Sequence, residues 1–292
     1  MIRITRAGPL CTLQDEGRFG MLAHGVSASG PMDRGAFRAA GALLERAGST
    51  AIEFTAAGLA LEAADALQVG LAGGVFNVTV NGKPMPWPGA AKLKRGDVLD
   101  ITPGPAGNYG YFRFDREVAI LPVMGSRSTN LTVGLGGLEG RALRAGDQIA
   151  LAGPGSGTVA EPPNVSAGGT VRVTWGLHAD LFTSKVREAF MDQPFVISTK
   201  LDRMGARLDD TTGVFADIRS LSLVSDAIVA GDIQILGDGT PIVLLRDHQP
   251  TGGYPRIATV ISADLDRFVQ MRPGTEVRFT PVTVAKAQGL LR

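Results

Sequence analysis

The sequence has one cysteine, three histidines and no excess of charge of either sign, and each shortage excludes a class of protein. Cys11 alone cannot form an intramolecular disulfide, which excludes a disulfide-stapled secreted fold. The 29 Lys and Arg residues balance 28 Asp and Glu residues, so we expect no nucleic acid partner. His24, His178 and His248 match no metal-ligand spacing, so we expect no metal site.

Long hydrophobic runs are also missing. No segment approaches the roughly 20 apolar residues that span a bilayer, so we expect no membrane partner. The start of the chain, Met1 to Arg6, alternates in polarity and lacks the apolar stretch of a signal peptide. We therefore expect a cytoplasmic protein. A standard phosphate loop is absent too, so a nucleotide bound by this chain would need another kind of site.

The sequence is rich in turn formers, with 39 glycines and 17 prolines, and its apolar segments are short and β-branched. This composition is typical of many strands and few helices. Asn81-Gly82 is a strong two-residue hairpin signal. The sequence therefore predicts a mainly β protein whose sheets close or stack to hide their edges. The expected strands are 68–71, 75–80, 98–101, 171–174, 241–245 and 276–279.

Three short helices are expected. Pro31 is predicted at the first position of the first helix, with Asp33 in its first turn. The second helix is predicted over about 178–190, and Ser262 is predicted to cap the third.

The best linker candidate is 153–170, because it combines turn formers with little apolar content. We therefore expect an N-terminal domain over 1–152 and a C-terminal domain over 171–292. A basic turn that leads into a strand occurs three times, before Val98, Gln148 and Glu276. This recurrence is consistent with related β-units, although such turns are common.

The most informative polar segment runs from Asp247 to Tyr254, directly after the apolar run 241–245. Polar loops at the ends of buried strands often carry function. Asp247 and His248 are candidate catalytic acid–base groups, although a loop histidine is often only a satisfied surface group. The candidate substrate-binding residues of this segment are Gln249, Thr251, Gly252, Gly253 and Tyr254.

Three further segments carry arginine: 14–18, 126–128 and 202–207. A guanidinium group can grip a carboxylate, carbamate or phosphate with two hydrogen bonds. Arg127 is therefore a candidate catalytic residue. An ordinary turn, a helix cap or an Asp–Arg pair that holds a loop remains the alternative in each segment. The other candidate substrate-binding residues are Gln14, Arg18, Ser126, Ser128, Arg203 and, more weakly, Gln234.

Taken in order, these segments resemble the biotin-dependent carboxyltransferase family. The family includes the C subunit of 5-oxoprolinase, allophanate hydrolase subunit 2, the carboxyltransferase domain of urea amidolyase and KipA-like proteins. The resemblance extends from about Pro9 to Arg278. It rests on Gln14-Asp15-x-Gly17-Arg18, Gly25-Val26 with Ser29-Gly30-x-Met32-Asp33, Gly125-Ser126-Arg127-Ser128-Thr129, Asp202-Arg203-Met204-Gly205-x-Arg207-Leu208, Gly231-x-Ile233-Gln234 and Asp247-x-Gln249-x-Thr251-Gly252-Gly253-Tyr254-Pro255.

The resemblance implies two cyclophilin-like β-barrel domains and a small-molecule amide or carboxylate substrate. It also implies a homologous second subunit, of the B type found in 5-oxoprolinase or KipI-like, and a further subunit of the A type. The chain has no biotinyl lysine in a Met-Lys-Met setting and no fused carboxylase. We therefore expect an ATP-dependent hydrolase complex that opens 5-oxoproline to glutamate, with ATP used together with the partner subunits. The alternatives are a carboxybiotin-dependent carboxyltransferase or allophanate hydrolase subunit for urea-type substrates, and a non-catalytic KipA-like regulator.

The sequence departs from the family pattern at three places. Leu201 stands where the family usually has Ser, and Pro250 replaces a threonine. Asp115 and Arg116 occupy the place of a Gly-Gly pair. We expect this last change to alter both backbone approach and charge near the pocket, and with them the substrate.

Overall fold

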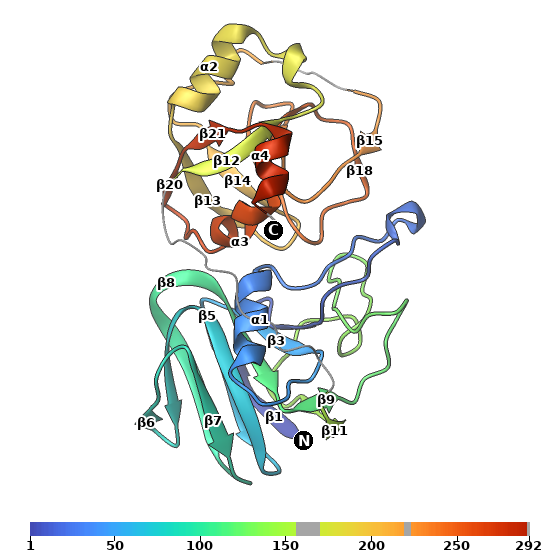
Figure 1. Ribbon diagram of the computed structural model, residues 1–292, viewed down its shortest axis with the longest axis vertical. Coiled ribbons are helices and arrows are strands. Elements are labelled where there is room, and N and C mark those ends of the chain that lie inside the picture. The colour runs from blue at the N-terminus through green and yellow to red at the C-terminus, as the bar shows by residue number, and fades with distance from the viewer. Residues whose placement is uncertain (156–169, 219–222, 291–292) are drawn as a thin grey trace. The chain divides into compact units, whose positions relative to one another are not determined.

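The computed structural model describes residues 1–155, 170–218 and 223–290. It confirms the mainly β prediction, because strands in curled sheets dominate and the helices are few and short (Figure 1). The chain divides into two compact units, Met1–Gly20 with Ala28–Val165, and Met21–Ser27 with Ser166–Arg292. Most of the predicted linker, residues 156–169, lies outside the described residues.

The first unit is built on a sheet with the strand order β10-β1-β4-β8-β3-β2, in which β5 also pairs with β8 and carries β6 and β7. β5 joins two strands that the sequence predicts separately, with a bulge near Gly73 between them. Asn81 and Gly82 form the predicted hairpin turn, both with positive φ. The strands are β1 (Ile2–Ala7), β2 (Thr12–Gln14), β3 (Ala51–Thr55), β4 (Leu59–Ala63), β5 (Leu67–Val80), β6 (Lys83–Pro84), β7 (Gly89–Leu93), β8 (Val98–Phe114), β10 (Gln148–Ile149) and the separate pair β9 (Arg116–Val118) and β11 (Leu151–Pro154).

Helix α1 (Arg34–Ala42) packs on β5 and β8 of this sheet (Figure 1). The prediction that Pro31 opens the helix is wrong. Asp33 is the N-cap, and its side chain accepts a hydrogen bond from the Ala36 backbone N–H at 2.8 Å. The buried Glu53 carboxylate accepts from the Met32 N–H at 2.8 Å and from the Tyr111 phenol at 2.7 Å, which holds the residues before the helix on the sheet.

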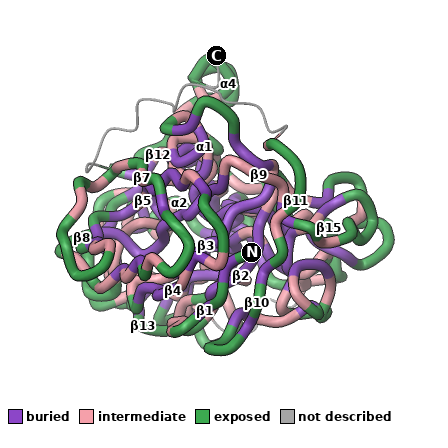
Figure 2. The backbone as a smooth tube through the Cα atoms, turned by 90° about the horizontal axis from the view of Figure 1, so that it is seen from below, coloured by how far each residue is buried: buried purple, intermediate pink, exposed green. Residues whose placement is uncertain are grey.

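The second unit is built on a sheet with the strand order β20-β13-β14-β17-β16-β19-β12-β21, and β15 and β18 form a separate pair. Across the described residues, burial is concentrated on the strands, whereas many outer turns are exposed (Figure 2). The predicted strand 276–279 is interrupted at Arg278. The strands are β12 (Val171–Trp175), β13 (Phe195–Leu201), β14 (Gly205–Asp209), β15 (Asp226–Ala227), β16 (Asp232–Ile235), β17 (Pro241–Leu244), β18 (Thr251–Gly252), β19 (Arg256–Val260), β20 (Glu276–Val277) and β21 (Phe279–Pro281).

The helices of the second unit differ from the predicted ones. The segment 178–190 splits into η2 (Ala179–Leu181) and α2 (Ser184–Asp192), because the Thr183 side chain caps a new helix by accepting from the Val186 N–H. Ser262 is the first residue of α3 (Ser262–Val269) and not its cap. Two short helices were not predicted, η1 (Leu22–His24) and α4 (Val284–Gly289). None of the described helices has the length and apolar content that crossing a membrane requires.

The core of the second unit is a cluster of phenylalanines. Phe190 of α2 stacks on Phe279 with 5.1 Å between ring centroids, and Phe195 stacks on Phe215 at 6.0 Å. All four rings are almost completely buried. Because alternate residues of a strand face opposite sides, one side of the sheet covers these rings and the other side is left for polar residues.

The three basic turns recognised in the sequence have the same hydrogen bonds. Gly96, Gly146 and Gly274 all have positive φ, and each donates its N–H to the carbonyl of a neighbouring segment at 2.7–2.8 Å. That segment returns a hydrogen bond to the next residue of the turn, as Ile4 does to the Asp147 carbonyl at 2.8 Å. The turn is thus one structural device that is used twice in the first unit and once in the second.

Alanine at these turns should be unfavourable by a similar amount in each case. Nothing lies within 4 Å of a Cβ built on Gly146 or Gly274, so the penalty comes from the positive φ alone. We expect Gly146→Ala and Gly274→Ala each to lower the free energy of unfolding by about 1 kcal/mol. Gly289→Ala, in α4, is the control, because that glycine has no positive φ and open space around it. Denaturant unfolding with equal stability for all three variants would contradict this reading.

Candidate functional site

In the first unit, the Asp15 carboxylate joins two of the predicted polar segments. Its oxygens accept hydrogen bonds from the Ser126 hydroxyl at 2.6 Å, the Ser128 hydroxyl at 2.7 Å and the Arg127 backbone N–H at 2.6 Å. Gly17 donates a fourth hydrogen bond at 3.0 Å. A single carboxylate therefore fixes the conformation of the turn that presents Arg127.

Burial and hydrogen bonding act in opposite directions on the pKa of Asp15. Desolvation by burial is the largest influence and raises the pKa, but the bonds from Ser126, Ser128, Arg127 and Gly17 together lower it below its usual value. The carboxylate is therefore ionised at neutral pH, when all four donors can bind it.

The Arg127 side chain is half-buried and only partly used within the unit. Its Nε donates to the Ile120 carbonyl at 2.7 Å, and Nη1 lies 3.5 Å from the Ser49 hydroxyl. Ser49 in turn donates to Glu117 at 2.8 Å. Nη2 has no hydrogen bond among the described residues. The guanidinium is thus held at one edge while its other edge can still bind an anion.

Gln14 and Arg18 lie under the same turn. The Gln14 Nε2 donates to the Thr129 carbonyl at 3.0 Å, and Arg18 donates to the carbonyls of Val123 and Ser128, both at 2.9 Å. Both side chains are almost completely buried. The structure thus brings five predicted residues together in the first unit, with Gln14 and Arg18 as supports beneath the others.

In the second unit, Arg203 and Asp247 form a buried ion pair. Arg203 donates to both Asp247 oxygens, with Nε at 2.9 Å and Nη2 at 3.1 Å, and both side chains are about 2% exposed or less. The pair joins the turn after β13 to the loop after β17. An Asp–Arg pair that holds a loop is the alternative that the sequence leaves open for this segment. The catalytic role predicted for Asp247 and the substrate-binding role predicted for Arg203 stay predictions.

His248 is buried next to this pair. Its Nδ1 lies 2.6 Å from the Gln249 carbonyl, which can only accept, so Nδ1 is the ring nitrogen that donates this hydrogen bond. The tautomer with its proton on Nδ1 leaves Nε2 as the acceptor. This tautomer is the one that a general base at Nε2 requires.

Three of the six remaining predicted residues of the second unit line one pocket of about 410 Å³. Gln234, Gln249 and Tyr254 line it. Thr251 and Gly252 form β18, which pairs with β15, and the Gly253 carbonyl accepts from Leu223 at 2.9 Å. The loop is thereby held beside the pocket, and a Cβ built on Gly252 would lie only 2.6 Å from the Gln234 Nε2.

Two cationic residues of this pocket, Lys200 and Arg207, received no role from the sequence. Arg207 belongs to a motif of the family resemblance. It lies on a strand between Ala206 and Leu208, which are buried, so the alternation of side chains places Arg207 on the face of the sheet opposite to theirs. Lys200 gave no such signal. Each of the two clusters lies within one unit.

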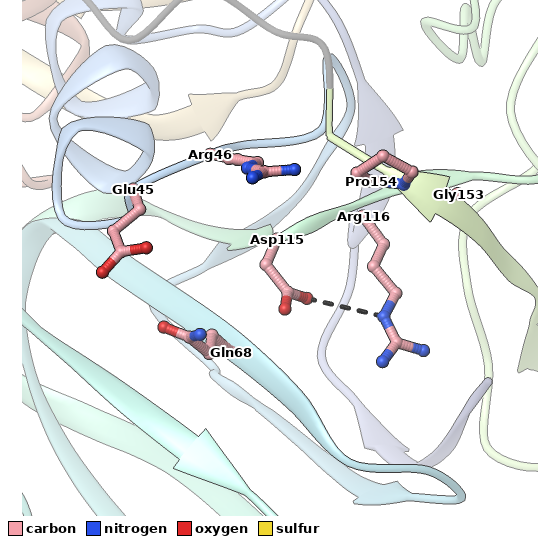
Figure 3. A pocket seen from close by; sticks show the side chains of 7 residues that line it. All are labelled: Glu45, Arg46, Gln68, Asp115, Arg116, Gly153 and Pro154. Carbon is pink, nitrogen blue, oxygen red and sulfur yellow. Dashed lines mark ion pairs between the residues drawn. The ribbon is translucent and has the colours of Figure 1, made fainter.

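Asp115 and Arg116 line a second pocket, of about 470 Å³, in the first unit (Figure 3). Glu45, Arg46 and Gln68 are also in its wall. Asp115 lies 3.9 Å from Arg116, and the two side chains are partly exposed. Charged groups therefore stand at this cavity, whereas their predicted effect on backbone approach and on the substrate stays a prediction.

The described residues contain no group of three or more His, Cys, Asp or Glu residues arranged to hold a metal ion. Cys11 is fully buried, and desolvation by burial raises the pKa of its thiol to about 11. At neutral pH this thiol is protonated and unsuited to nucleophilic chemistry. The chemistry of the described residues therefore rests on carboxylates, guanidinium groups, amides and His248.

The family model described as "carboxyltransferase domain, subdomain A and B" matches residues 24–281. Two relatives share one name, as the C subunit of 5-oxoprolinase. The Haemophilus influenzae protein is 31% identical over 100% of this chain and 94% of its own length, and the Escherichia coli protein is 32% identical over 98% and 93%. The crystal structure of the K. lactis urea amidolyase matches with a TM-score of 0.89 and 27% identity, over 98% of this chain and 19% of that protein.

Replacing Asp15 should reveal how strongly the first cluster depends on its charge. We expect Asp15→Asn to lower the free energy of unfolding by about 1–3 kcal/mol at neutral pH, because an amide cannot accept all four hydrogen bonds. The folded-state pKa of Asp15 is depressed, so its contribution is present above the ordinary value of 3.8 and is lost as pH falls through the folded-state pKa.

The measurement is a series of melting curves at decreasing pH. The gap between wild type and variant should be constant above pH ~4 and should then shrink, because the wild-type carboxylate becomes protonated. Glu139→Gln is the control, since this exposed carboxylate pairs only with Arg141 and should change stability by less than ~0.5 kcal/mol. A gap that persists unchanged down to pH ~2 would show that the Asp15 charge is unimportant.

Proposed function

The chain belongs to the carboxyltransferase-domain family, and from this premise we propose that it is one component of an ATP-dependent complex of the 5-oxoprolinase type. The substrate would be 5-oxoproline, a small cyclic amide, and the product glutamate. The observation that carries the proposal is the near end-to-end match to two proteins named as the C subunit of 5-oxoprolinase, at 31% and 32% identity.

The geometry of the two clusters supports chemistry on a small amide. When an amide is opened, negative charge develops on its carbonyl oxygen and the nitrogen gains a proton. Arg127 offers the open edge of a guanidinium to an oxyanion or a phosphate group. His248, with its Nδ1 proton fixed on the Gln249 carbonyl, offers Nε2 for proton transfer.

The other predicted residues divide into those that bind and those that position. The hydroxyl groups of Ser126 and Ser128 donate hydrogen bonds to Asp15, so their role is to position Arg127. The Arg203–Asp247 pair positions the loop that bears His248. Gln234, Gln249 and Tyr254, beside Thr251, Gly252 and Gly253, form the wall that contacts the amide.

The proposed partners are the A-type and B-type subunits of such a complex, because both relatives are named as its C-type component. ATP would serve through the assembled complex. The Arg127 edge suits a phosphate or a carboxylate equally well, so carboxybiotin fits the same residue. A urea-type carboxyltransferase is therefore the competing function, and the K. lactis urea amidolyase structure, with its TM-score of 0.89, is the observation that favours it.

The test is turnover by the reconstituted complex. The chain is purified with its partner subunits, and the ATP-dependent release of glutamate from 5-oxoproline is measured. Arg127→Ala should lower kcat by about 100-fold, the size expected when one group that stabilises a developing charge is removed. Arg3→Ala is the matched control, because Arg3 is exposed and pairs only with Glu62, and it should retain full activity.

The remaining outcomes separate the alternatives. Carboxylation of urea by carboxybiotin, without hydrolysis of 5-oxoproline, would replace the proposal by the carboxyltransferase function. A tight complex that turns over neither substrate would indicate a KipA-like binding protein. If Arg127→Ala retains full activity on 5-oxoproline, the proposed function stands, but Arg127 does not stabilise the developing charge.

A further inference from the structure

The pocket of the second unit lies on the face of the sheet that points away from the phenylalanine core. Arg207 of β14 is paired with Ile242 of β17, and Ile242 is paired with Gln234 of β16. Directly paired residues point to the same face, so these three side chains form a row across the sheet. With neighbouring strands ~4.8 Å apart, Arg207 and Gln234 stand about 10 Å from each other.

A β-bulge adds Lys200 to the same end of the row. Between the pairs Ile197↔Leu208 and Leu201↔Ala206, β13 has three residues where β14 has only Arg207. Bulges of this kind are common next to binding sites, where they redirect a side chain. Thr199 and Lys200 of the bulge both line the pocket with Arg207.

The other end of the row is covered. Gln234 faces the pocket side of the sheet yet is only 1% exposed, because the loop containing Gly252 lies over it. Its Nε2 is buried without a hydrogen-bond partner in the described structure. A buried amide N–H without an acceptor is destabilising, so this donor is suited to the carbonyl oxygen of a ligand.

The charges of the pocket favour an anion. Neither the Arg207 guanidinium nor the Lys200 ammonium forms a hydrogen bond or an ion pair within 4 Å with a described residue, although Arg207 interacts electrostatically with the exposed Asp238 carboxylate. Asp202 is the one carboxylate in the lining, and its Oδ1 already accepts from the Met204 and Gly205 N–H groups at 2.7 and 3.2 Å. Between the two ends lie apolar side chains, namely Met204, Ile242 and Leu244.

We infer that this pocket selects small amides that carry a carboxylate, with Arg207 and Lys200 binding the carboxylate and Gln234 the amide carbonyl. The apolar middle then takes the short carbon skeleton that joins the two groups. 5-Oxoproline has this pattern, whereas urea has no carboxylate and no carbon skeleton. The inference rests on the proposed function for the choice of ligand, but it concerns binding and not turnover.

Direct binding to the purified full chain, without partner subunits, tests the inference. The probes for calorimetry are 5-oxoproline, its neutral analogue 2-pyrrolidone, and inorganic phosphate. We expect 5-oxoproline to bind at least about tenfold more tightly than 2-pyrrolidone, and Arg207→Gln to remove that advantage. Arg207→Lys should restore part of it, while Arg278→Gln, at an exposed arginine of the same unit, should have no effect.

A second pair of variants tests the carbonyl end. Gln234→Met keeps the volume but removes the donor, and the Gly252→Ala methyl group would press on the Gln234 amide. Both variants should lower the affinity for 5-oxoproline and for 2-pyrrolidone by the same factor. Arg207→Gln, by contrast, should change the ratio of the two affinities. Melting curves control for folding, and Arg207→Gln should melt like wild type because it loses no internal hydrogen bond.

The inference is overturned if 5-oxoproline fails to bind, if both lactams bind equally, or if Arg207→Gln leaves their ratio unchanged. Phosphate binding that depends on Arg207 without binding of 5-oxoproline would also overturn it. These results are independent of the turnover assay. If the complex hydrolyses 5-oxoproline although this pocket does not bind it, the inference is refuted and the proposed function stands. If the pocket binds 5-oxoproline but the complex does not hydrolyse it, the inference stands and the proposed function is refuted.

Discussion

A carboxylate that joins two distant loops organises the polar cluster in each unit, namely the part-buried Asp15 and the buried Asp247. In the first unit the Asp15 carboxylate holds the turn of residues 126–128 through three hydrogen bonds and accepts a fourth from Gly17. In the second, Asp247 holds Arg203 across 44 positions of sequence. A charge removed from water must be satisfied where it lies, so each carboxylate forces its partners into one geometry. The loops that carry Arg127 and His248 are therefore fixed before any ligand arrives.

Each cluster has one arginine that supports the surrounding loops and one that retains unused donors. Arg203 and Arg18 are nearly fully buried and bond to protein acceptors, so both support the loops around them. Arg127 and Arg207 are half-buried and retain unused donors. A guanidinium with free donors at a cavity can bind an anionic ligand, whereas one enclosed by carbonyls and carboxylates cannot do so without breaking those bonds.

The proposed pocket of the second unit depends on the same distinction between open and enclosed arginines. Relatives on this fold are named for 5-oxoprolinase or for urea amidolyase, and 5-oxoproline and urea differ in charge. A pocket with a carboxylate-binding end and a carbonyl-binding end discriminates by what it leaves unpaired, because a neutral substrate would leave two cations without a partner. Asp115 and Arg116 add two charged groups at a second cavity.

Much of this was determined by the sequence alone. Turn formers and short β-branched segments determined the mainly β class, and the order of the polar motifs identified the family, because both are local patterns. The prediction that Pro31 is the first residue of the helix is wrong, because Glu53 and Tyr111, which contact the residues before α1, lie on strands far along the chain. Only the tertiary structure decided that Arg203 pairs with Asp247, that Gly252 covers Gln234, and that a bulge places Lys200 beside Arg207. These outcomes depend on strand register and on loop closure between distant residues, and no local pattern encodes either one.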